Sequence, residues 1–231
     1  MNQPVPTPIV IDDALTAPIL TDLLTRHPAL AGVAGDLVQA SRLIAASFAA
    51  GNKFLICGNG GSAADAEHWS GELLKNFERR RPAPLDADQD PHLRGRLEQG
   101  LPAIPLTGFT SLRTATANDR EAVCEYAQLV AALGRPGDVL AGISTSGNAG
   151  NVGLAVRAAN ARGMTTIGLT GQGGGALKDL VTLCIRVPSS RTADVQELHL
   201  AVYHAICRVL EAAFYPGSHI AFHPGITPVS P

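Results

Sequence analysis

The chain has 231 residues, enough to bury a sizeable core within a single domain. Hydrophobic residues make up 45% of it and aromatic residues only 4%, so we expect a core of Ala, Val, Ile and Leu, as in parallel α/β sheets. The formal net charge of -2 argues against a nucleic-acid partner. The densest basic run, Arg79, Arg80 and Arg81, is more typical of a solvated helix end than of a binding patch.

The four cysteines are far apart and form no CxxC pair, which disfavours a thiolate zinc site and a disulfide framework. We expect small, buried, apolar side chains at Cys57, Cys124, Cys184 and Cys207. The first residues lack the basic and apolar regions of a secretory signal, and no apolar run approaches the ~20 residues that span a bilayer. A cytoplasmic location is therefore expected, with neither membrane nor nucleic acid as a partner.

Apolar residues recur at helical spacing from Asp12 to about Ala50, for example at Leu15, Ile19 and Leu23. The pair His27 and Pro28 interrupts this pattern, which predicts two helices. Neither helix carries an obvious reactive group, so their expected role is packing on the sheet or against another subunit.

Five short apolar runs bounded by turn residues predict strands. They are Phe54–Cys57, Ala103–Leu106, Val139–Ile143, Thr166–Leu169 and Leu183–Val187. Helical stretches lie between them at about 62–78, 119–133 and 148–162. Alternating strands and helices of these lengths imply right-handed crossovers and a parallel sheet. The expected fold class is α/β, a three-layer, doubly wound sandwich.

The remaining segments complete a single domain over residues 1–231, with N-terminal helices at 1–50 and the α/β core at 51–214. A last helix is predicted from about Asp194 to Phe214, followed by an irregular, Pro- and Gly-rich tail at 215–231. Residues 82–102 are polar and broken by prolines, so we expect a surface loop with one helical turn around Leu93–Gln99. A loop of this length is either a functional lid or a tolerated insertion.

The first predicted strand runs into the sequence GNGGS at residues 58–62, where a helix begins. Glycines at such a turn allow close approach of a ligand to the backbone, and the free N–H groups of a helix start favour an anion such as phosphate. Ser62 with Asp65 three residues later also matches a capping box. The alternative interpretation is a tight turn with a good helix cap.

The third predicted strand ends in Ser144, Thr145 and Ser146, again at a helix start. These hydroxyls can donate hydrogen bonds to phosphate oxygens. Two such turns at the C-terminal ends of parallel strands favour a phosphorylated ligand, because open α/β sheets bind ligands at that edge. Neither turn matches the GxxxxGK[ST] or GxGxxG nucleotide motifs.

Candidate chemical groups lie on two of the predicted helices. His68 and Glu72 are four residues apart and share a helix face, while Gln196 and His204 are eight apart and can lean toward one cleft. Imidazole, carboxylate and amide oxygen could bind zinc or perform acid–base catalysis. Taken alone, the His68–Glu72 pair is better explained as a solvated i,i+4 pair.

Five segments together resemble the sugar isomerase (SIS) domain family, and within it the phosphoheptose isomerases, over roughly residues 12–214. They are GNGGSAADAEHWSGEL at 58–73, the pair Asn118–Asp119, GDVLAGISTSGN at 137–148, GLTGQGGG at 168–175 and RVPSSRTADVQELHLAVYH at 186–204. The resemblance implies a five-stranded parallel sheet of flavodoxin-like order. It also implies a homotetramer with active sites between subunits and the conversion of sedoheptulose 7-phosphate to D-glycero-D-manno-heptose 7-phosphate.

The resemblance further implies roles for individual residues. Glu72 and His204 would be the acid–base pair, and one zinc ion per subunit would be bound by His68, Glu72, Gln196 and His204. Contacts to the substrate would come from Asn59, Gly60, Gly61, Ser62, Asn118, Asp119, Ser144, Thr145, Ser146 and Gln196. Ketose–aldose isomerisation through a cis-enediol needs a carboxylate base and a second acid–base group but no redox cofactor.

Two features depart from the family pattern. Many members have a serine where this chain has Ala149, and the 82–102 loop is longer than usual. The DnaA initiator-associating proteins resemble the same family but act as tetrameric binding proteins, and they lack the second histidine of the last helix, so His204 favours an enzyme. A phosphosugar sensor or an isomerase of another phosphosugar stays open, as does the heptose pathway that would use the product.

Overall fold

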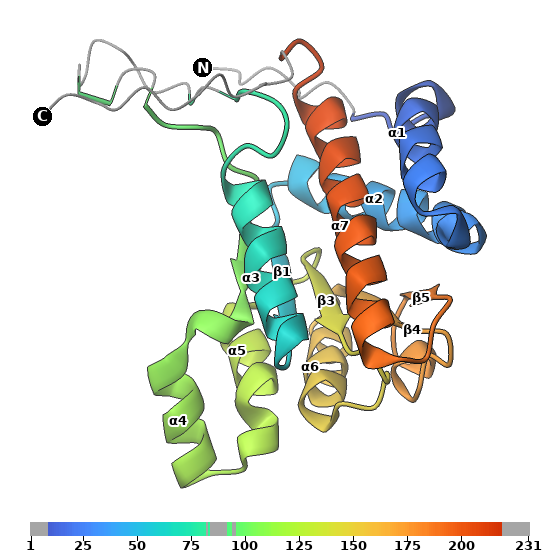
Figure 1. Cartoon of the computed structure of the whole chain (residues 1–231). Coiled ribbons are helices and arrows are strands. Elements are labelled where there is room, and N and C mark those ends of the chain that lie inside the picture. Colours follow the sequence, from blue (N-terminus) through green and yellow to red (C-terminus); the bar gives the residue numbers. More distant parts are fainter. Residues whose placement is uncertain (1–8, 82, 84–91, 94–95, 219–231) are drawn as a thin grey trace, which may run out of the picture.

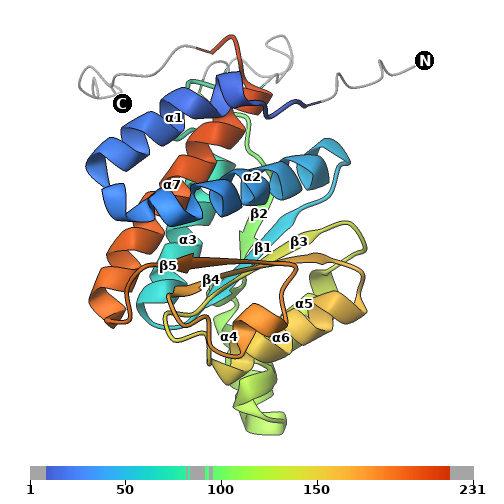
Figure 2. The ribbon, with the colours of Figure 1, turned by 90° about the vertical axis from the view of Figure 1, so that its right-hand side faces the viewer.

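The computed structural model describes residues 9–81, 83, 92–93 and 96–218, and its centre is a parallel sheet covered by helices on both faces (Figures 1 and 2). The strands are β1 (Phe54–Gly58), β2 (Ala103–Pro105), β3 (Val139–Ile143), β4 (Thr165–Gly171) and β5 (Leu183–Val187). Their order is β2-β1-β3-β4-β5, and every pairing is parallel. The strand order reverses direction at β1 and β3, which places a topological switch point between their C-terminal ends.

Helices connect the strands and form the outer layers. The α-helices are α1 (Asp13–Arg26), α2 (Ala34–Ala49), α3 (Gly61–Leu74), α4 (Thr110–Asp119), α5 (Glu125–Leu133), α6 (Gly150–Ala161) and α7 (Thr192–Phe214). Short 3₁₀ turns occur at η1 (Pro28–Val33), η2 (Leu106–Gly108), η3 (Ala122–Cys124) and η4 (Leu177–Asp179). The predicted three-layer fold is therefore confirmed.

Alternation along β1 explains the two cores on either side of the sheet. Phe54 and Ile56 face the layer built by α1, α2, α3 and α7, whereas Leu55 and Cys57 face α5 and α6. All four side chains are fully buried, as expected of a central strand with two covered faces.

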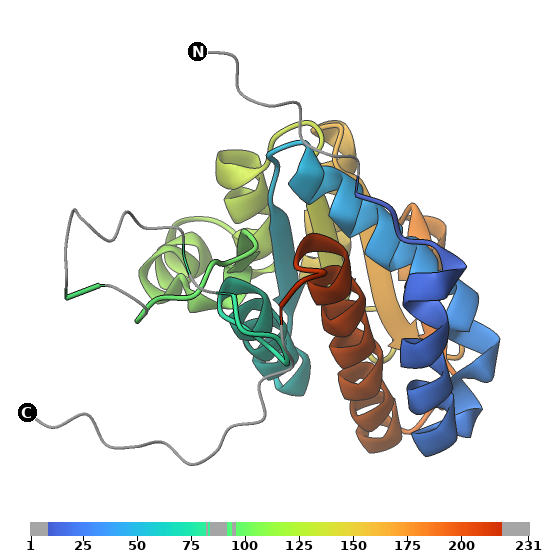
Figure 3. The same ribbon diagram turned by 90° about the horizontal axis from the view of Figure 1, so that it is seen from above.

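The two predicted N-terminal helices are present, and the break falls where Pro28 begins η1. Figure 3 shows α7 lying between α3 and these helices. By length and hydropathy alone, Pro28–Ala49 would be long and apolar enough to cross a membrane. In this fold its apolar side, including Leu37 and Ile44, is buried in the core against the sheet and α7.

The helix predicted at about 119–133 begins only at Glu125, as α5, and a separate helix that the sequence did not predict, α4, precedes it. Helix α4 ends at Asp119, Arg120 leaves the helical region with φ -140° and ψ -131°, and α5 begins only at Glu125. None of the residues of α4 is buried, so its sequence has no apolar face that could have revealed it. Figure 2 shows α4 projecting away from the sheet.

The expectation of a solvated Arg79–Arg81 run at a helix end is also wrong. Helix α3 stops at Leu74, and the Arg81 side chain is fully buried, 3.4 Å from Glu211 on α7. Its guanidinium donates to the carbonyl oxygens of Glu72 and Leu73, which have no partner within α3 because the helix ends there. Arg81, which the sequence predicted to be solvated, is therefore buried and binds both α3 and α7.

The cysteines are free, and Cys57 and Cys207 are buried as predicted, whereas Cys124 and Cys184 are partly exposed. Most of the predicted 82–102 loop and residues 219–231 of the tail lie outside the described residues. Within that loop, the Arg96 amide donates to the Leu93 carbonyl at 3.1 Å, which forms one turn at the predicted place.

Candidate active site

A pocket of about 330 Å³ opens at the C-terminal ends of β1 and β3, at the topological switch point. It is lined by Asn59, Gly61, Ser62, Ile143, Ser144, Thr145, Ser146, Ala149, Thr192 and Gln196. Helices α3 and α7 begin beside it, and α6 begins one residue after Ala149. Free backbone N–H groups and the positive ends of helix dipoles therefore converge on the pocket, which suits a phosphate group.

The first turn is built around glycines. Gly60 has φ +56°, a conformation that favours glycine, and it starts α3. A Cβ on Gly61 would lie 2.2 Å from the side-chain nitrogen of Gln196, so glycine leaves room for the Gln196 side chain against the first turn. Gln196 therefore lies against the first turn and lines the pocket.

The predicted capping box at Ser62 is wrong. Because Gly60 is the N-cap and α3 begins at Gly61, Ser62 lies inside the helix, and its backbone N–H donates to the Asn59 carbonyl. The Ser62 side chain lines the pocket, and Asp65 lies near the Tyr203 hydroxyl on α7.

The serine–threonine turn of residues 144–146 packs against a second glycine-rich loop, residues 171–175, whose role was not apparent from the sequence. Gly147 has φ +70°, and a Cβ there would meet the carbonyl oxygen of Gly174 at 2.0 Å. The Gly171 amide donates to the Thr145 carbonyl at 3.0 Å. The GLTGQGGG segment therefore packs against the turn of residues 144–146 and supports it.

His68 and Glu72 form a pair about two helical turns beyond the pocket. The His68 Nε2 atom is 3.0 Å from a Glu72 carboxylate oxygen, and the other ring nitrogen is 2.9 Å from the Tyr203 hydroxyl. Tyr203 is fully buried and stacks on Trp69. Its hydroxyl thereby fixes the orientation of a half-exposed imidazole.

His204 completes this second group. Its ring lies edge-on to that of His68, with 5.0 Å between the ring centroids. Burial, and next the proximity of His68, lowers the pKa of His204 to about 4, so its imidazole is neutral at pH 7. Its Nε2 atom is buried and has no hydrogen-bond partner among the described residues, which leaves a site free for a proton or another ligand.

The predicted site residues of α3 and α7 lie beside one another in the same order along the two helices. Gly61 meets Gln196 and His68 meets His204, so α3 and α7 run side by side in the same direction. The seven residues from Gly61 to His68 span about 10 Å along a helix. An elongated substrate could therefore reach from the pocket to the histidines.

The predicted metal ligands are only partly brought together. Two imidazoles and a carboxylate are donors that zinc accepts, and the unpartnered Nε2 atom of His204 fits such a role. Gln196, however, lies against Gly61 at the other end of the two helices. Among the described residues, no three His, Cys, Asp or Glu side chains are grouped closely enough to hold a metal ion.

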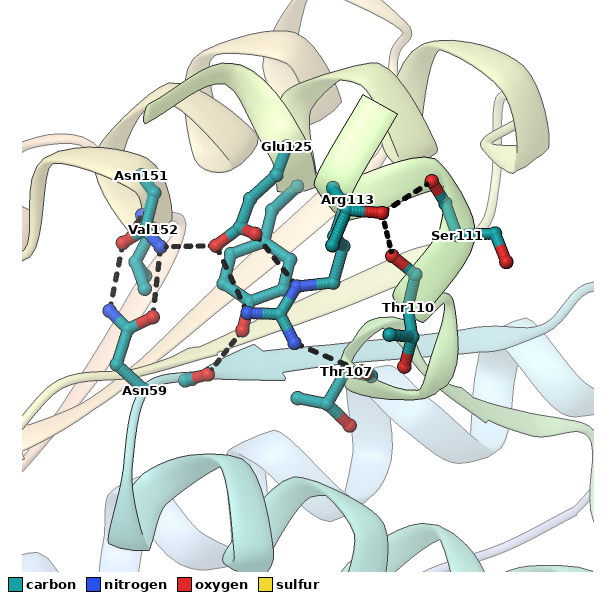
Figure 4. Close-up of polar contacts among 11 residues, drawn as sticks. Asn59, Thr107, Thr110, Ser111, Arg113, Glu125, Asn151 and Val152 are labelled. Atoms are coloured by element: carbon teal, nitrogen blue, oxygen red, sulfur yellow. Dashed lines mark hydrogen bonds and ion pairs between the residues drawn. The ribbon is translucent and has the colours of Figure 1, made fainter. Parts of the chain in front are cut away.

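Asn118 and Asp119 are not part of this pocket. They end α4, are exposed, and are joined to each other by a hydrogen bond of 2.8 Å. Helix α4 is tied to the first turn indirectly, through the polar contacts of Arg113, Glu125 and Asn151 that Figure 4 shows.

Comparison with known proteins identifies the family. The family model for the SIS domain matches residues 25–87 and 95–171, more than half of the chain. A phosphoheptose isomerase from Akkermansia muciniphila is 41% identical over 189 residues, which cover 82% of this chain and 91% of that protein. The chain belongs to the SIS domain family.

Solved structures agree with this SIS domain assignment. A phosphoheptose isomerase from Neisseria gonorrhoeae superposes with a TM-score of 0.68 at 34% identity, over 88% of this chain and all of that one. A phosphoheptose isomerase from Francisella tularensis gives a TM-score of 0.69 at 31% identity, over 86% of this chain and 96% of that one. The expected flavodoxin-like strand order of the SIS domain is confirmed.

Some residues of this SIS domain site were missed in the sequence. Thr192 lines the pocket because α7 begins there, and Tyr203 and Asp65 hold His68 through the tyrosine hydroxyl. The sequence pattern gave Tyr203 no role of its own. Only its hydroxyl, buried next to a predicted catalytic helix, could have suggested a polar role.

Proposed function

We propose that this protein is a phosphoheptose isomerase, an intramolecular oxidoreductase that converts sedoheptulose 7-phosphate to D-glycero-D-manno-heptose 7-phosphate. The observation that carries the proposal is that α3 and α7 hold two different groups of side chains at different points along their length. A pocket suited to phosphate lies at their first residues, and a histidine–glutamate–histidine group lies about two turns further along. A phosphorylated ketose bound along these helices would present its reacting carbons to that group.

In the proposed reaction, Glu72 removes a proton from C1 of the ketose while the C2 oxygen gains a proton. The resulting cis-enediol then receives a proton at C2 and loses one from the C1 oxygen, which yields the aldose. His204 suits the transfers at oxygen, because its buried Nε2 atom has no hydrogen-bond partner among the described residues and can exchange a proton with the sugar. No electrons leave the substrate, so no redox cofactor is needed.

The proposal includes a zinc ion held by His68, Glu72, Gln196 and His204, one per subunit. When bound, zinc would polarise the sugar oxygens as a Lewis acid. His68 already has its second ring nitrogen within hydrogen-bond distance of Tyr203, a contact typical of metal-binding histidines. Gln196 would have to move toward the histidines, or the histidines toward it, for all four to bind one ion.

We further propose a cytoplasmic homotetramer. Among the exposed large apolar side chains are Leu74 on α3, Leu200 on α7 and Phe109 before α4. Contacts with other subunits would cover them, and two of the three lie on the helices that carry the site. Helix α4 buries no residue within its own chain, so its exposed Asn118 and Asp119 are free to contribute to a site shared with another subunit.

The experiment that tests the function is incubation of the purified protein with sedoheptulose 7-phosphate, followed by NMR for the aldose product, with and without added zinc. We expect the aldose signals to grow with time in proportion to the protein. Turnover of a different phosphosugar but not of this one would move the assignment to another isomerase. No turnover of any phosphosugar would favour a binding protein of the initiator-associating kind.

A further inference from the structure

The side chain of Asn59, in the first turn, is already engaged by the protein. Its amide nitrogen donates to the Asn151 side-chain oxygen at 2.8 Å, and its amide oxygen accepts from the Asn151 nitrogen at 2.8 Å (Figure 4). One N–H of each amide group is used in this reciprocal pair. An exposed asparagine that would otherwise rotate freely is thus held in one orientation.

The orientation of Asn151 is itself fixed. Its oxygen accepts from the Val152 amide at 2.9 Å, and its nitrogen donates to a Glu125 carboxylate oxygen at 2.9 Å. If the Asn151 amide were turned over, its NH₂ group would face the Val152 N–H and its oxygen would face the carboxylate. Both contacts would be repulsive, so the carboxylate of Glu125 determines which way Asn151, and therefore Asn59, must point.

Glu125 also holds Arg113 of α4. The Arg113 Nε atom is 2.7 Å from one carboxylate oxygen and a terminal nitrogen is 3.4 Å from the other, while the second terminal nitrogen donates to the Thr107 carbonyl at 3.1 Å. The side chains of Glu125 and Arg113 are 13% and 32% exposed, so solvent weakens this pair less than a surface ion pair. Helix α4 has no buried residue, so this pair and the partly buried Leu112, which packs against the apolar layer of α5 and α6, both attach it to the domain.

The contacts close into a ring around the first turn. Arg113 lies over the Tyr126 ring at 5.4 Å, and the Tyr126 hydroxyl donates to the carbonyl of Gly58, the residue before Asn59. From Gly58 the path returns through Tyr126, Arg113, Glu125 and Asn151 to Asn59. The phosphate-binding turn and the helix that ends in Asn118 and Asp119 therefore share one hydrogen-bonded frame.

We infer that Arg113, Glu125 and Asn151 are positioning residues that hold the Asn59 side chain in place at the pocket and keep α4 in register with the first turn. This inference deepens the proposed function and rests on it. None of the three residues needs to touch the substrate. They act by fixing the Asn59 side chain and the direction of α4.

The decisive variant is Glu125→Gln, which keeps the size of the side chain. If its amide oxygen faces Arg113, its NH₂ group meets the NH₂ group of Asn151, so Asn151 must rotate and release Asn59. We expect KM for the substrate to rise by roughly tenfold or more, about the loss of one hydrogen bond, while kcat changes much less. Asn151→Ala should raise KM similarly, and in an Asn59→Ala background it should add nothing further.

Asn160→Ala is the matched control, because Asn160 lies on the same helix as Asn151 and its side chain donates to the Leu180 carbonyl at 2.8 Å, away from the pocket. Asn160→Ala should lower the free energy of unfolding about as much as Asn151→Ala does, and it should leave KM unchanged. If Asn151→Ala and Asn160→Ala lower stability equally and neither changes KM, the network is merely structural and the inference fails.

Two readouts do not depend on turnover. Hydrogen exchange of residues 110–119 should be faster in Glu125→Gln than in Asn160→Ala, because α4 loses one of its attachments to the domain. Titration with inorganic phosphate should show weaker binding in Asn151→Ala than in the control. Failure of the wild type to isomerise sedoheptulose 7-phosphate would therefore contradict the proposed function alone, whereas unchanged exchange and unchanged phosphate affinity in these variants would overturn the positioning roles.

Discussion

Glu72 lies on α3 with its carboxylate 3.0 Å from the Nε2 atom of His68, and we assign it the removal of the carbon-bound proton. Glu72→Gln keeps the shape but removes the proton acceptor, so kcat should fall by about 10²–10⁴ while substrate still binds. Steady-state kinetics and a separate binding titration measure the two effects. Zinc content must be determined beside the rate, because Glu72 is also a proposed ligand.

Glu67→Gln is the matched control for this prediction, since Glu67 is an exposed carboxylate on the same helix. It should leave kcat near the wild-type value. His68→Ala should act mainly by lowering bound zinc. A Glu72→Gln enzyme that turns over at the wild-type rate would remove Glu72 from the proton transfer.

Ser146 is an exposed hydroxyl residue of the pocket, and its side chain also accepts a hydrogen bond from the Asn148 amide at 3.2 Å. Ser146→Ala should chiefly weaken substrate binding, by roughly the 1.5–3 kcal/mol of a hydrogen bond to a charged group. KM should therefore rise with little change in kcat. Ser47→Ala removes a buried hydroxyl on α2 that is bonded to Gly137, far from the pocket, and should leave KM unchanged. A large fall in kcat at constant KM would mean that this turn binds the reacting end of the sugar.

At the scale of elements, α3 and α7 are joined at their C-terminal parts by the buried Arg81–Glu211 pair. Glu211 accepts three backbone N–H bonds, from residues 77–79, and Arg81 caps the last carbonyls of α3. Arg81→Met leaves the Glu211 carboxylate buried without its counter-charge and should lower the free energy of unfolding by about 3–5 kcal/mol. Urea unfolding measures this loss.

The neighbouring Arg80 gives a direct comparison. Its side chain is 56% exposed and pairs with Glu98, so Arg80→Met should cost no more than about 1 kcal/mol. Adding Glu211→Gln to Arg81→Met should recover part of the stability, because the unpaired buried charge is removed. Equal losses of unfolding free energy in Arg80→Met and Arg81→Met would contradict the role assigned to the buried Arg81–Glu211 pair.

For the whole molecule, two histidines of α7 should make stability depend on pH. Burial lowers the pKa of His199 to about 4, and burial followed by the charge of His68 lowers that of His204 to about 4. A histidine with a depressed pKa takes up a proton first in the unfolded chain, so its contribution is present above pH ~6.5 and is lost as pH falls toward 4. For the fully buried His199 the loss is roughly 3 kcal/mol.

Urea midpoints measured from pH 7.5 to 4 should fall accordingly, and the slope should be smaller in His199→Gln. Glu211 and Asp65 act in the opposite direction, because burial raises their pKa and the folded state gains stability when they bind a proton. A wild-type stability that rises steadily on acidification would show that these carboxyl groups outweigh the histidines.

Local sequence was sufficient for much of this fold and for part of the site. The five strands were predictable because each is a short apolar run bounded by turn residues, and the predicted His68–Glu72 contact is confirmed because helical geometry alone places residues four apart together. The closeness of the two glycine- and hydroxyl-rich turns followed from the rule that parallel strands bring their C-terminal ends to one edge. These features depend on neighbours in the chain or on a general topological rule.

What the sequence by itself determined is therefore the sheet, its order by family resemblance, and the types of chemical group at its edge. Tertiary structure alone decided that Arg81 is buried, because its partner Glu211 lies 130 residues away on another helix. It also decided that α4 is a separate helix and that Asn59 is held by Asn151, since no local pattern marks a helix without a buried face or an amide pair across 92 residues. The physical reason is that periodicity reports which side of an element is buried, whereas the partner of a charge or an amide is set only when distant elements pack together.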